Sequence, residues 1–255
     1  LPAMGSNSVD LIVTSPPYDE LRAYKGFTWD FELIACESYR VLKPGGVLVW
    51  VVGDGIDKNR SETLTSFKQA IYFKESVGFN VHQTLIFHDP GTAFPDVTRY
   101  TRQHEYMFVL SKGRPKTINL QTQRNKWAGD RRPEGSIKTQ QEPDGTRSIR
   151  QRKPVKEFGV LGTVWTMDTG HGKSTKDKIA FDHPAIFPED LARRHILTWS
   201  NPGDLVMDYF SGSGTTAKVA RGLERAFIGC DMSLEYVELA QQRLNQTAMP
   251  MFDIT

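Results

Sequence analysis

The sequence has few cysteines and no long apolar run, and both absences narrow the classes of protein that it can encode. Its 255 residues include two cysteines, Cys36 and Cys230, which lie far apart inside apolar segments. They have neither the number of a disulfide framework nor the spacing of a zinc site, so we expect no metal, no disulfide and two small core side chains in a reducing compartment. No apolar stretch approaches the ~18 residues that a membrane span requires, and no signal-peptide pattern opens the chain.

Net charge is also small, at +2, but it is unevenly distributed. Residues 111–180 hold 16 of the 32 Lys and Arg residues and 7 of the 30 Asp and Glu residues, a net charge of +9 that leaves −7 for the remainder. One strongly basic block in a near-neutral chain is typical of proteins that bind a polyanion through that block. A solvated basic loop would have the same composition, so both interpretations stay open at this point.

Apolar periodicity predicts alternating helices and strands on both sides of the basic block. Before it, the predicted strands are 11–13, 47–52, 81–88 and 105–111, and the predicted helices are 30–42 and 62–77. After it come a helix up to about Trp199, strands at 205–209 and 226–230, and helices at 214–223 and 233–244. We therefore expect an α/β fold with a mostly parallel sheet, divided into residues 1–111, an insertion at 112–180 and residues 181–255.

Residues 14–18, with the sequence Thr-Ser-Pro-Pro-Tyr, follow a β-branched run that is typical of a buried central strand. Neither Pro16 nor Pro17 has an N–H to donate, and both fix φ at about −65°, so the turn is stiff. It holds the Ser15 hydroxyl, the Pro16 carbonyl and the Tyr18 ring in one arrangement. Because ligands of open α/β sheets lie beyond the carboxyl ends of the strands, we expect this turn to be the active site.

Residues 208–216, Asp-Tyr-Phe-Ser-Gly-Ser-Gly-Thr-Thr, lie between a predicted strand and a predicted helix. Glycines at such a point allow a tight turn and the close approach of a ligand, while the helix N-terminus supplies N–H groups. Asp231 follows the next strand, where an acid is suited to bind ribose hydroxyls. Ala217 departs from the dinucleotide glycine motif, and the missing P-loop lysine disfavours an NTPase. A turn without a ligand would also fit this pattern alone.

Together, these segments resemble the motifs of the DNA amino-methyltransferases, which use S-adenosylmethionine. Residues 14–18 are similar to the catalytic signature, and residues 208–216 to the cofactor loop, usually Asp-Pro-Phe-x-Gly-Ser-Gly-Thr-Thr. Residues 183–191, His-Pro-Ala-Ile-Phe-Pro-Glu-Asp-Leu, are similar to a further motif that packs on the cofactor. Their order is that of the circularly permuted beta group. The resemblance covers the chain except residues 112–180, and it implies a Rossmann-like methyltransferase fold with helices on both faces of the sheet and a basic target-recognition insertion.

The resemblance also implies residue roles. The catalytic residues would be Ser15, Pro16, Pro17 and Tyr18. The residues expected to bind S-adenosylmethionine, and its product S-adenosylhomocysteine, are Thr14, His183, Pro184, Phe187, Asp208, Phe210, Gly212, Ser213, Gly214, Thr215, Thr216 and, through the ribose hydroxyls, Asp231. The Ser15 hydroxyl and the Pro16 carbonyl can accept both hydrogens of an exocyclic base amine, which makes its nitrogen a better nucleophile. The target base must be flipped out of the duplex, and Tyr18 is placed to stack on it.

Three departures from the family pattern bear on these expectations. The strand that normally precedes residues 8–10 is missing from the sequence, which would fit a truncated chain. Tyr209 replaces the usual proline of the cofactor loop, which should be tolerated. Residue 15 is Ser instead of Asp, and Ser-Pro-Pro-Tyr is more usual among N4-cytosine enzymes, so we favour N4 of cytosine over N6 of adenine. His104-Glu105 resembles a weak family motif, and Asp54 is a candidate for the pocket lining.

Other classes of protein fit less well. A C5-cytosine enzyme needs a nucleophilic Cys, normally after a proline, whereas both cysteines here follow Ala or Gly. A protein-glutamine or RNA methyltransferase normally places the cofactor motif first. A DNA-binding protein with an inactive methyltransferase fold stays open. Double-stranded DNA is the expected partner, and the resemblance suggests a cognate restriction endonuclease and a homodimer as further ones. We expect a cytoplasmic, nucleoid-associated protein of a bacterium, archaeon or phage, with no membrane contact.

Overall fold

The computed structural model describes residues 1–17, 29–91, 98–126, 128, 137–151 and 155–246. It separates into two compact units, a large unit made of Leu1–Asn119 and Thr163–Thr255, and a small unit made of Leu120–Gly162. The small unit is narrower than the insertion predicted at 112–180. The other residues of the predicted insertion belong to the large unit or lie next to residues of it. For example, the Asn119 N–H donates a hydrogen bond to the Thr198 carbonyl at 2.8 Å.

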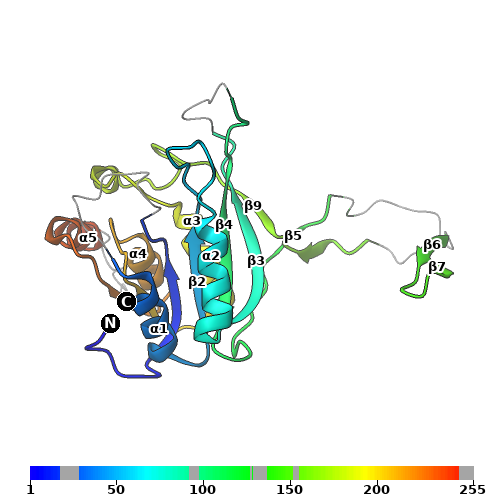
Figure 1. Cartoon of the computed structure of the whole chain (residues 1–255), viewed down its shortest axis with the longest axis horizontal. Coiled ribbons are helices and arrows are strands. Elements are labelled where there is room, and N and C mark those ends of the chain that lie inside the picture. The colour runs from blue at the N-terminus through cyan, green and yellow to red at the C-terminus, as the bar shows by residue number, and fades with distance from the viewer. Residues whose placement is uncertain (18–28, 92–97, 127, 129–136, 152–154, 247–255) are drawn as a thin grey trace, which may run out of the picture. The chain divides into compact units, whose positions relative to one another are not determined.

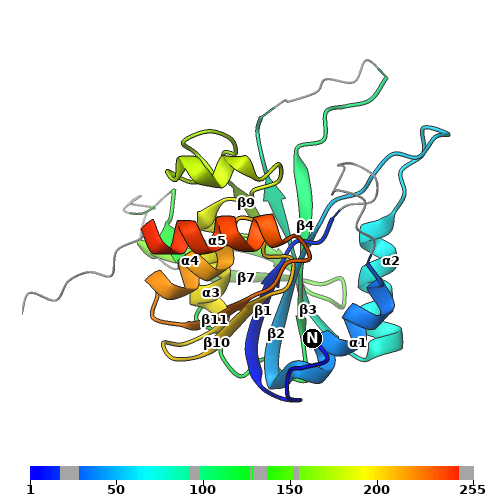
Figure 2. The ribbon, with the colours of Figure 1, turned by 90° about the vertical axis from the view of Figure 1, so that its left-hand side faces the viewer.

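The large unit is built on a seven-stranded sheet with the order β11-β10-β1-β2-β4-β3-β9; Figure 1 labels β2, β4, β3 and β9, and Figure 2 labels β11, β10 and β1. Neighbouring strands are parallel except where β4 pairs with β2 and β3, so the prediction of a mostly parallel sheet is confirmed. The strands are β1 (Val9–Thr14), β2 (Leu42–Val52), β3 (Asn80–His88), β4 (His104–Ser111), β9 (Val164–Thr166), β10 (Leu205–Asp208) and β11 (Ala226–Gly229).

Helices cover both faces of this sheet, as expected (Figure 2). On one face lie α1 (Phe31–Val41), α2 (Thr65–Tyr72) and the π-helical turn Phe73–Val77. On the other face lie α3 (Glu189–Trp199) and α4 (Thr215–Gly222), and α5 (Leu234–Gln246) packs beside α4. The 3₁₀ turn Lys178–Asp182 precedes α3.

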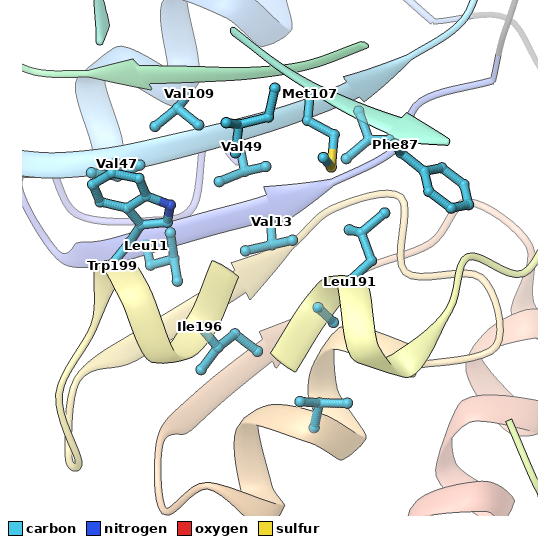
Figure 3. Close-up of a cluster of buried hydrophobic side chains, with 14 of the residues drawn as sticks. Leu11, Val13, Val47, Val49, Phe87, Met107, Val109, Leu191, Ile196 and Trp199 are labelled. Carbon is cyan, nitrogen blue, oxygen red and sulfur yellow. The ribbon is translucent and has the colours of Figure 1, made fainter. Parts of the chain in front are cut away.

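The alternation of side chains along β1 explains the two layers. Leu11 and Val13 are fully buried toward α3 and α4, where they pack with Val49 and Ile196 (Figure 3). Ile12, between them, is fully buried on the opposite face with the side chains of α1. A strand that is buried on both faces reads as a continuous apolar run, which is why the sequence marked β1 as central.

Three sequence-based expectations need correction. Strand β2 begins at Leu42, not at residue 47, because Val9 pairs with Leu42. Since Leu11 then pairs with Val47, the residues of β2 between these two pairs form an irregularity in the strand. The helix predicted at 62–77 begins only at Thr65. Cys36 and Cys230 are exposed instead of lying in the core, since Cys36 is on the outer side of α1 and Cys230 follows the edge strand β11.

The small unit consists of two pairs of antiparallel strands. Strand β5 (Thr122–Arg124) pairs with β8 (Phe158–Val160), and β6 (Ile137–Gln141) forms a hairpin with β7 (Arg147–Gln151). The hairpin turn is closed by the Glu142 N–H, which donates to the Thr146 carbonyl at 2.9 Å. In the part of the chain that the structure describes, no helix is long and apolar enough to cross a membrane.

Candidate active site

The four adjacent parallel strands β11, β10, β1 and β2 end at the same edge of the sheet. This edge therefore carries the Ser15-Pro16-Pro17 turn after β1, the glycine loop at 211–214 after β10, and Asp231 after β11. Two motifs that lie about 190 residues apart in sequence become neighbours, because β1 and β10 are paired with Leu11 opposite Val206 and Ile12 opposite Met207.

The turn that follows β1 is partly enclosed. Ser15 and Pro17 are half-buried and Pro16 is buried. Pro16 therefore lies against the body of the protein, while the Ser15 side chain keeps access to solvent. Tyr18, the fourth residue of the predicted catalytic set, lies outside the described residues, and its stacking role stays a prediction.

Asp208, at the end of β10, joins this turn to the glycine loop. Its Oδ1 accepts a hydrogen bond from the Thr14 hydroxyl at 2.7 Å and one from the Phe210 N–H at 3.1 Å, and its Oδ2 accepts from the Thr216 hydroxyl at 2.8 Å. The side chain is 1% exposed. Burial raises the pKa of Asp208 to about 6, against the opposing effect of the hydroxyl and amide donors.

The glycine loop is shaped by its two glycines and their neighbours. Gly212 and Gly214 have φ of 48° and 75°, a region that side chains rarely adopt. A Cβ on Gly212 would lie 2.8 Å from His183 Nε2, and a Cβ on Gly214 would lie 2.8 Å from Ala240 Cβ. The loop is thus held between the segment that precedes α3 and helix α5, and no larger residue fits at either position.

Asp231 lies beside this loop. Its Oδ2 accepts from the Gly212 N–H and its Oδ1 from the Ser233 N–H, both at 2.9 Å. A carboxylate oxygen has two lone pairs, so each keeps capacity for a further donor such as a ribose hydroxyl. The acceptors that Asp231 offers at this edge therefore fit a cofactor with a ribose.

The predicted motif at 183–191 reaches the glycine loop through His183. This ring is buried, contacts Tyr236 with ring centroids 4.3 Å apart, and accepts the Ala185 N–H at its Nδ1 at 3.1 Å. Pro184 is exposed, and the half-buried Phe187 packs against the hydrophobic core. The motif therefore supports the loop mainly through His183.

Aromatic rings pack against Phe210, which precedes the glycine loop. Phe210 contacts Trp29, with ring centroids 5.1 Å apart. Tyr209, which stands where the family has proline, is buried and shares a hydrogen bond with the Ser38 hydroxyl at 2.8 Å. Because the Ser38 hydroxyl donates to the Ile34 carbonyl, Tyr209 is the donor in this pair. Burial raises the pKa of Tyr209.

A model of the N6/N4 type of DNA methylase matches residues 9–242 of the chain. The chain belongs to the N6/N4 DNA methylase family. Members of this family transfer a methyl group from S-adenosylmethionine to an amino group of DNA, so the motifs at the sheet edge belong to an S-adenosylmethionine-dependent DNA methyltransferase.

Relatives and solved structures agree with this assignment. The orphan methyltransferase M.BamHII of Bacillus amyloliquefaciens is 52% identical over 244 residues, which cover 94% of this chain and 90% of that protein. The type II methyltransferase M1.MboII of Moraxella bovis is 32% identical over 249 residues, covering 94% and 91%. The structure of PvuII DNA methyltransferase, described as cytosine-N4-specific, has a TM-score of 0.67 at 21% identity, over 95% of this chain and 81% of that one. A complex of M1.HpyAVI with S-adenosylmethionine has the same fold, with a TM-score of 0.58 at 24% identity, over 93% and 90%.

Asp54 and His104, which the sequence analysis also named, form contacts outside the Ser15 turn and the glycine loop. Asp54, after β2, accepts from the Ser66 N–H at 2.8 Å and the Ser66 hydroxyl at 2.7 Å, so it caps the start of α2. His104 begins β4 opposite His88 and contacts the Tyr106 ring, at the same edge as the active-site turn because β4 runs antiparallel to β2.

Sequence reasoning missed one buried residue of the methylase, Arg243 of α5. Its guanidinium donates to the Ser213 carbonyl and hydroxyl and to the Thr215 hydroxyl, so these hydroxyls are engaged by the protein itself. The signal was present, since Arg243 falls on the same helix face as the buried Tyr236 and Leu239. A charge on an apolar stripe indicates a buried ionic partner.

The Asp208→Asn variant tests the buried carboxylate. Because the pKa of Asp208 is about 6 in the folded protein and about 3.8 ordinarily, the folded state keeps a proton that the unfolded chain releases between about pH 4 and pH 6. Wild-type stability should therefore fall by about 2 kcal/mol across that window and change little above pH 7. Asn does not titrate. The difference in unfolding free energy between variant and wild type, measured in urea at each pH, should move by about 2 kcal/mol in favour of Asn from pH 4 to pH 7.

The exposed Asp182, changed to Asn in a control, corrects for the loss of one carboxylate. A difference between Asp208→Asn and wild type that stays constant over this pH range would show that the fold does not perturb Asp208.

Proposed function

We propose that this chain methylates N4 of cytosine in double-stranded DNA, with residues 14–18 acting on the target base and residues 208–216 and Asp231 holding S-adenosylmethionine. The single observation that carries the proposal is the hydrogen bond from Thr14 to Asp208, which places the Ser15 turn directly beside the glycine loop. A methyl donor in that loop and an amine at that turn would be adjacent. Serine at position 15, in place of the aspartate usual in N6-adenine enzymes, favours cytosine.

The proposed roles follow from the chemistry of each group. S-adenosylmethionine, when bound, would supply an electrophilic methyl group and leave as S-adenosylhomocysteine, and the methylated amine would release one proton to water. The amine of a base is a weak nucleophile because its lone pair is delocalised into the ring. The Ser15 hydroxyl and the Pro16 carbonyl accept its two hydrogens and favour a nitrogen with an available lone pair. Because Pro16 is buried and two prolines fix the turn, these acceptors are held in place before the base arrives.

The target amine lies inside a duplex, so we propose that the base is flipped into the site. DNA is the partner that this requires. A cognate restriction endonuclease stays a prediction, since the relatives' names include both type II and orphan methyltransferases. A homodimer also stays a prediction. A location on DNA in the cytoplasm is likewise a prediction.

We propose the small unit as the target-recognition element. Residues 120–162 contain ten Lys and Arg and five Asp and Glu, a net charge of +5 that suits a DNA backbone. In its hairpin, Thr139 pairs with Ile149 and Gln141 with Arg147, so these four side chains share one face, and all four are exposed. A two-stranded ribbon fits the major groove, where Arg pairs with guanine, Gln with adenine, and an apolar side chain contacts the thymine methyl.

The base assignment is tested by nucleoside mass spectrometry of DNA incubated with the protein and isotopically labelled S-adenosylmethionine. We expect labelled N4-methylcytosine. Labelled N6-methyladenine would keep the active site and overturn the choice of base. Binding of DNA and cofactor without any labelled nucleoside would favour an inactive methylase that only binds DNA.

Ser15→Ala should lower turnover by about 100-fold or more, because the amine loses one of its two acceptors. Affinity for S-adenosylmethionine, measured by calorimetry, should stay within about twofold, since the glycine loop and Asp231 are unchanged. Ser61→Ala, on an exposed loop, is the matched control and should keep wild-type turnover. Wild-type turnover in Ser15→Ala would remove Ser15 from the mechanism.

Arg147→Ala should broaden the recognition sequence at one base pair, since each wrong base pair is rejected by about 1–3 kcal/mol through such a contact. Sequencing of methylated positions in bulk genomic DNA measures this. Arg193→Ala removes an exposed charge from α3 of the large unit and should leave the pattern unchanged. If Arg147→Ala slowed methylation equally at all sites, Arg147 would contact the phosphates and not the bases.

A further inference from the structure

Arg243 is a buried cation at the centre of a partly exposed ionic cluster behind the glycine loop. The cluster consists of Arg243 and Lys218 with Asp177 and Glu189, two cations and two carboxylates. Arg243 is 1% exposed and comes from α5, whereas Lys218 comes from α4, Glu189 from the first turn of α3, and Asp177 from the segment before the 3₁₀ turn. Four separate segments of the large unit thus meet at one guanidinium.

One side of the guanidinium holds the glycine loop. Its Nη1 donates to the Ser213 carbonyl at 3.1 Å, to the Ser213 hydroxyl at 3.2 Å and to the Thr215 hydroxyl at 2.9 Å. These residues flank Gly214, whose positive φ and close contact with Ala240 leave the loop little freedom. The same helix therefore fixes the loop twice, by close packing at Ala240 and by hydrogen bonds from Arg243.

The other side of the guanidinium holds the segment that carries His183. Nε donates to Asp177 Oδ2 at 2.8 Å, and Nη2 donates to Glu189 Oε1 at 2.6 Å and to the Thr175 hydroxyl at 3.1 Å. Lys218 donates to the same two carboxylates, at 2.7 Å each. Burial alone would raise the pKa of Asp177 and Glu189, but the hydrogen bonds from Arg243 and Lys218 to Asp177, and from Lys218 and Thr175 to Glu189, hold both below their usual range.

Stability alone does not explain this cluster. Burying charges has a large desolvation cost, and well-packed apolar residues often stabilise a core as well as an ion cluster does. A guanidinium, however, has five N–H groups in a rigid plane, and here it contacts acceptors both in the glycine loop and in the segment that carries His183. His183 then meets Gly212 from the segment that Arg243 fixes. The geometry is that of a brace between two parts of a binding site.

We propose that Arg243 is a positioning residue that fixes the glycine loop and residues 174–189 in one arrangement before the methyl donor binds, an inference that rests on the proposed function of this loop. Arg243 does not touch the cofactor in this scheme. It acts by keeping the loop in the shape that accepts it, so that binding does not have to order the loop.

The test compares Arg243→Lys with wild type in the full chain. Lysine keeps the charge but lacks the planar set of donors, so the dissociation constant for S-adenosylmethionine, measured by calorimetry, should rise by about 10-fold or more. Hydrogen exchange of the peptide 208–217 without cofactor should be faster, and affinity for DNA should stay within about twofold. Asp177→Asn is the milder variant, because Asp177 is partly exposed, and it should raise the same constant by a smaller factor.

Arg225→Lys is the matched control. Arg225 is also a buried arginine of the large unit, at 8% exposure, but it donates to Ser200 and Leu223 and not to the glycine loop. It should lower stability while leaving cofactor affinity and exchange at 208–217 unchanged. If Arg243→Lys and Asp177→Asn both bound the cofactor within twofold of wild type, the proposal would be overturned. If wild type itself bound no cofactor, the proposed function would fail, and the exchange rates alone would test the positioning role of Arg243. Faster exchange at 208–217 in Arg243→Lys would support that role, and equal exchange would overturn it.

Discussion

Asp208 lies where two segments from distant parts of the chain meet, and its carboxylate accepts hydrogen bonds from both. Thr14 is 194 residues away in sequence, yet it shares this carboxylate with Thr216 at the start of α4. The Thr216 hydroxyl also lies 3.3 Å from the Val13 carbonyl, so its one hydrogen faces acceptors of both segments. Because Ser15 follows Thr14 directly, the hydrogen bonds of Asp208 tie the position of the Ser15 turn to that of the glycine loop. In the proposed function, one buried group would therefore set the positions of both the methyl donor and the target amine.

Several ionisable groups are buried around the glycine loop, and this distribution has a physical reason. A loop with two glycines at positive φ is intrinsically free in the unfolded chain, and ordering it is costly in entropy. The chain offsets this cost with charged hydrogen bonds, from the Gly212 N–H to the Asp231 carboxylate on one side and from Arg243 to Ser213 and Thr215 on the other. Charge-assisted bonds are stronger and more directional than neutral ones, so they suit a loop whose shape matters more than its packing.

The sequence sufficed for those parts of the fold and site that are local. The apolar run of β1, the stiff turn after it and the glycine loop are each encoded within a few residues, and the fold class followed from alternating helices and strands. Pairing between distant segments is not encoded in this way. The antiparallel insertion of β4, the addition of β9 to the sheet edge beside β3 and the early start of β2 depend on which strands meet in space. The partners of Arg243 lie 28 to 68 residues away, so periodicity could mark the residue as unusual but not name its partners.

The two units differ in the sign of their net charge. With +5 on residues 120–162 and +2 on the whole chain, the large unit carries −3. Electrostatic attraction supplies much of the non-specific affinity of DNA-binding proteins, so the positive net charge of the small unit supports its proposed role in binding DNA. In the proposed function, the sheet edge reads no sequence by itself, because its acceptors for an exocyclic amine would bind any base that presents one and fits. If the exposed hairpin face reads the bases, as proposed, substitutions there would change the recognition sequence without disturbing Asp208, Arg243 or the glycine loop.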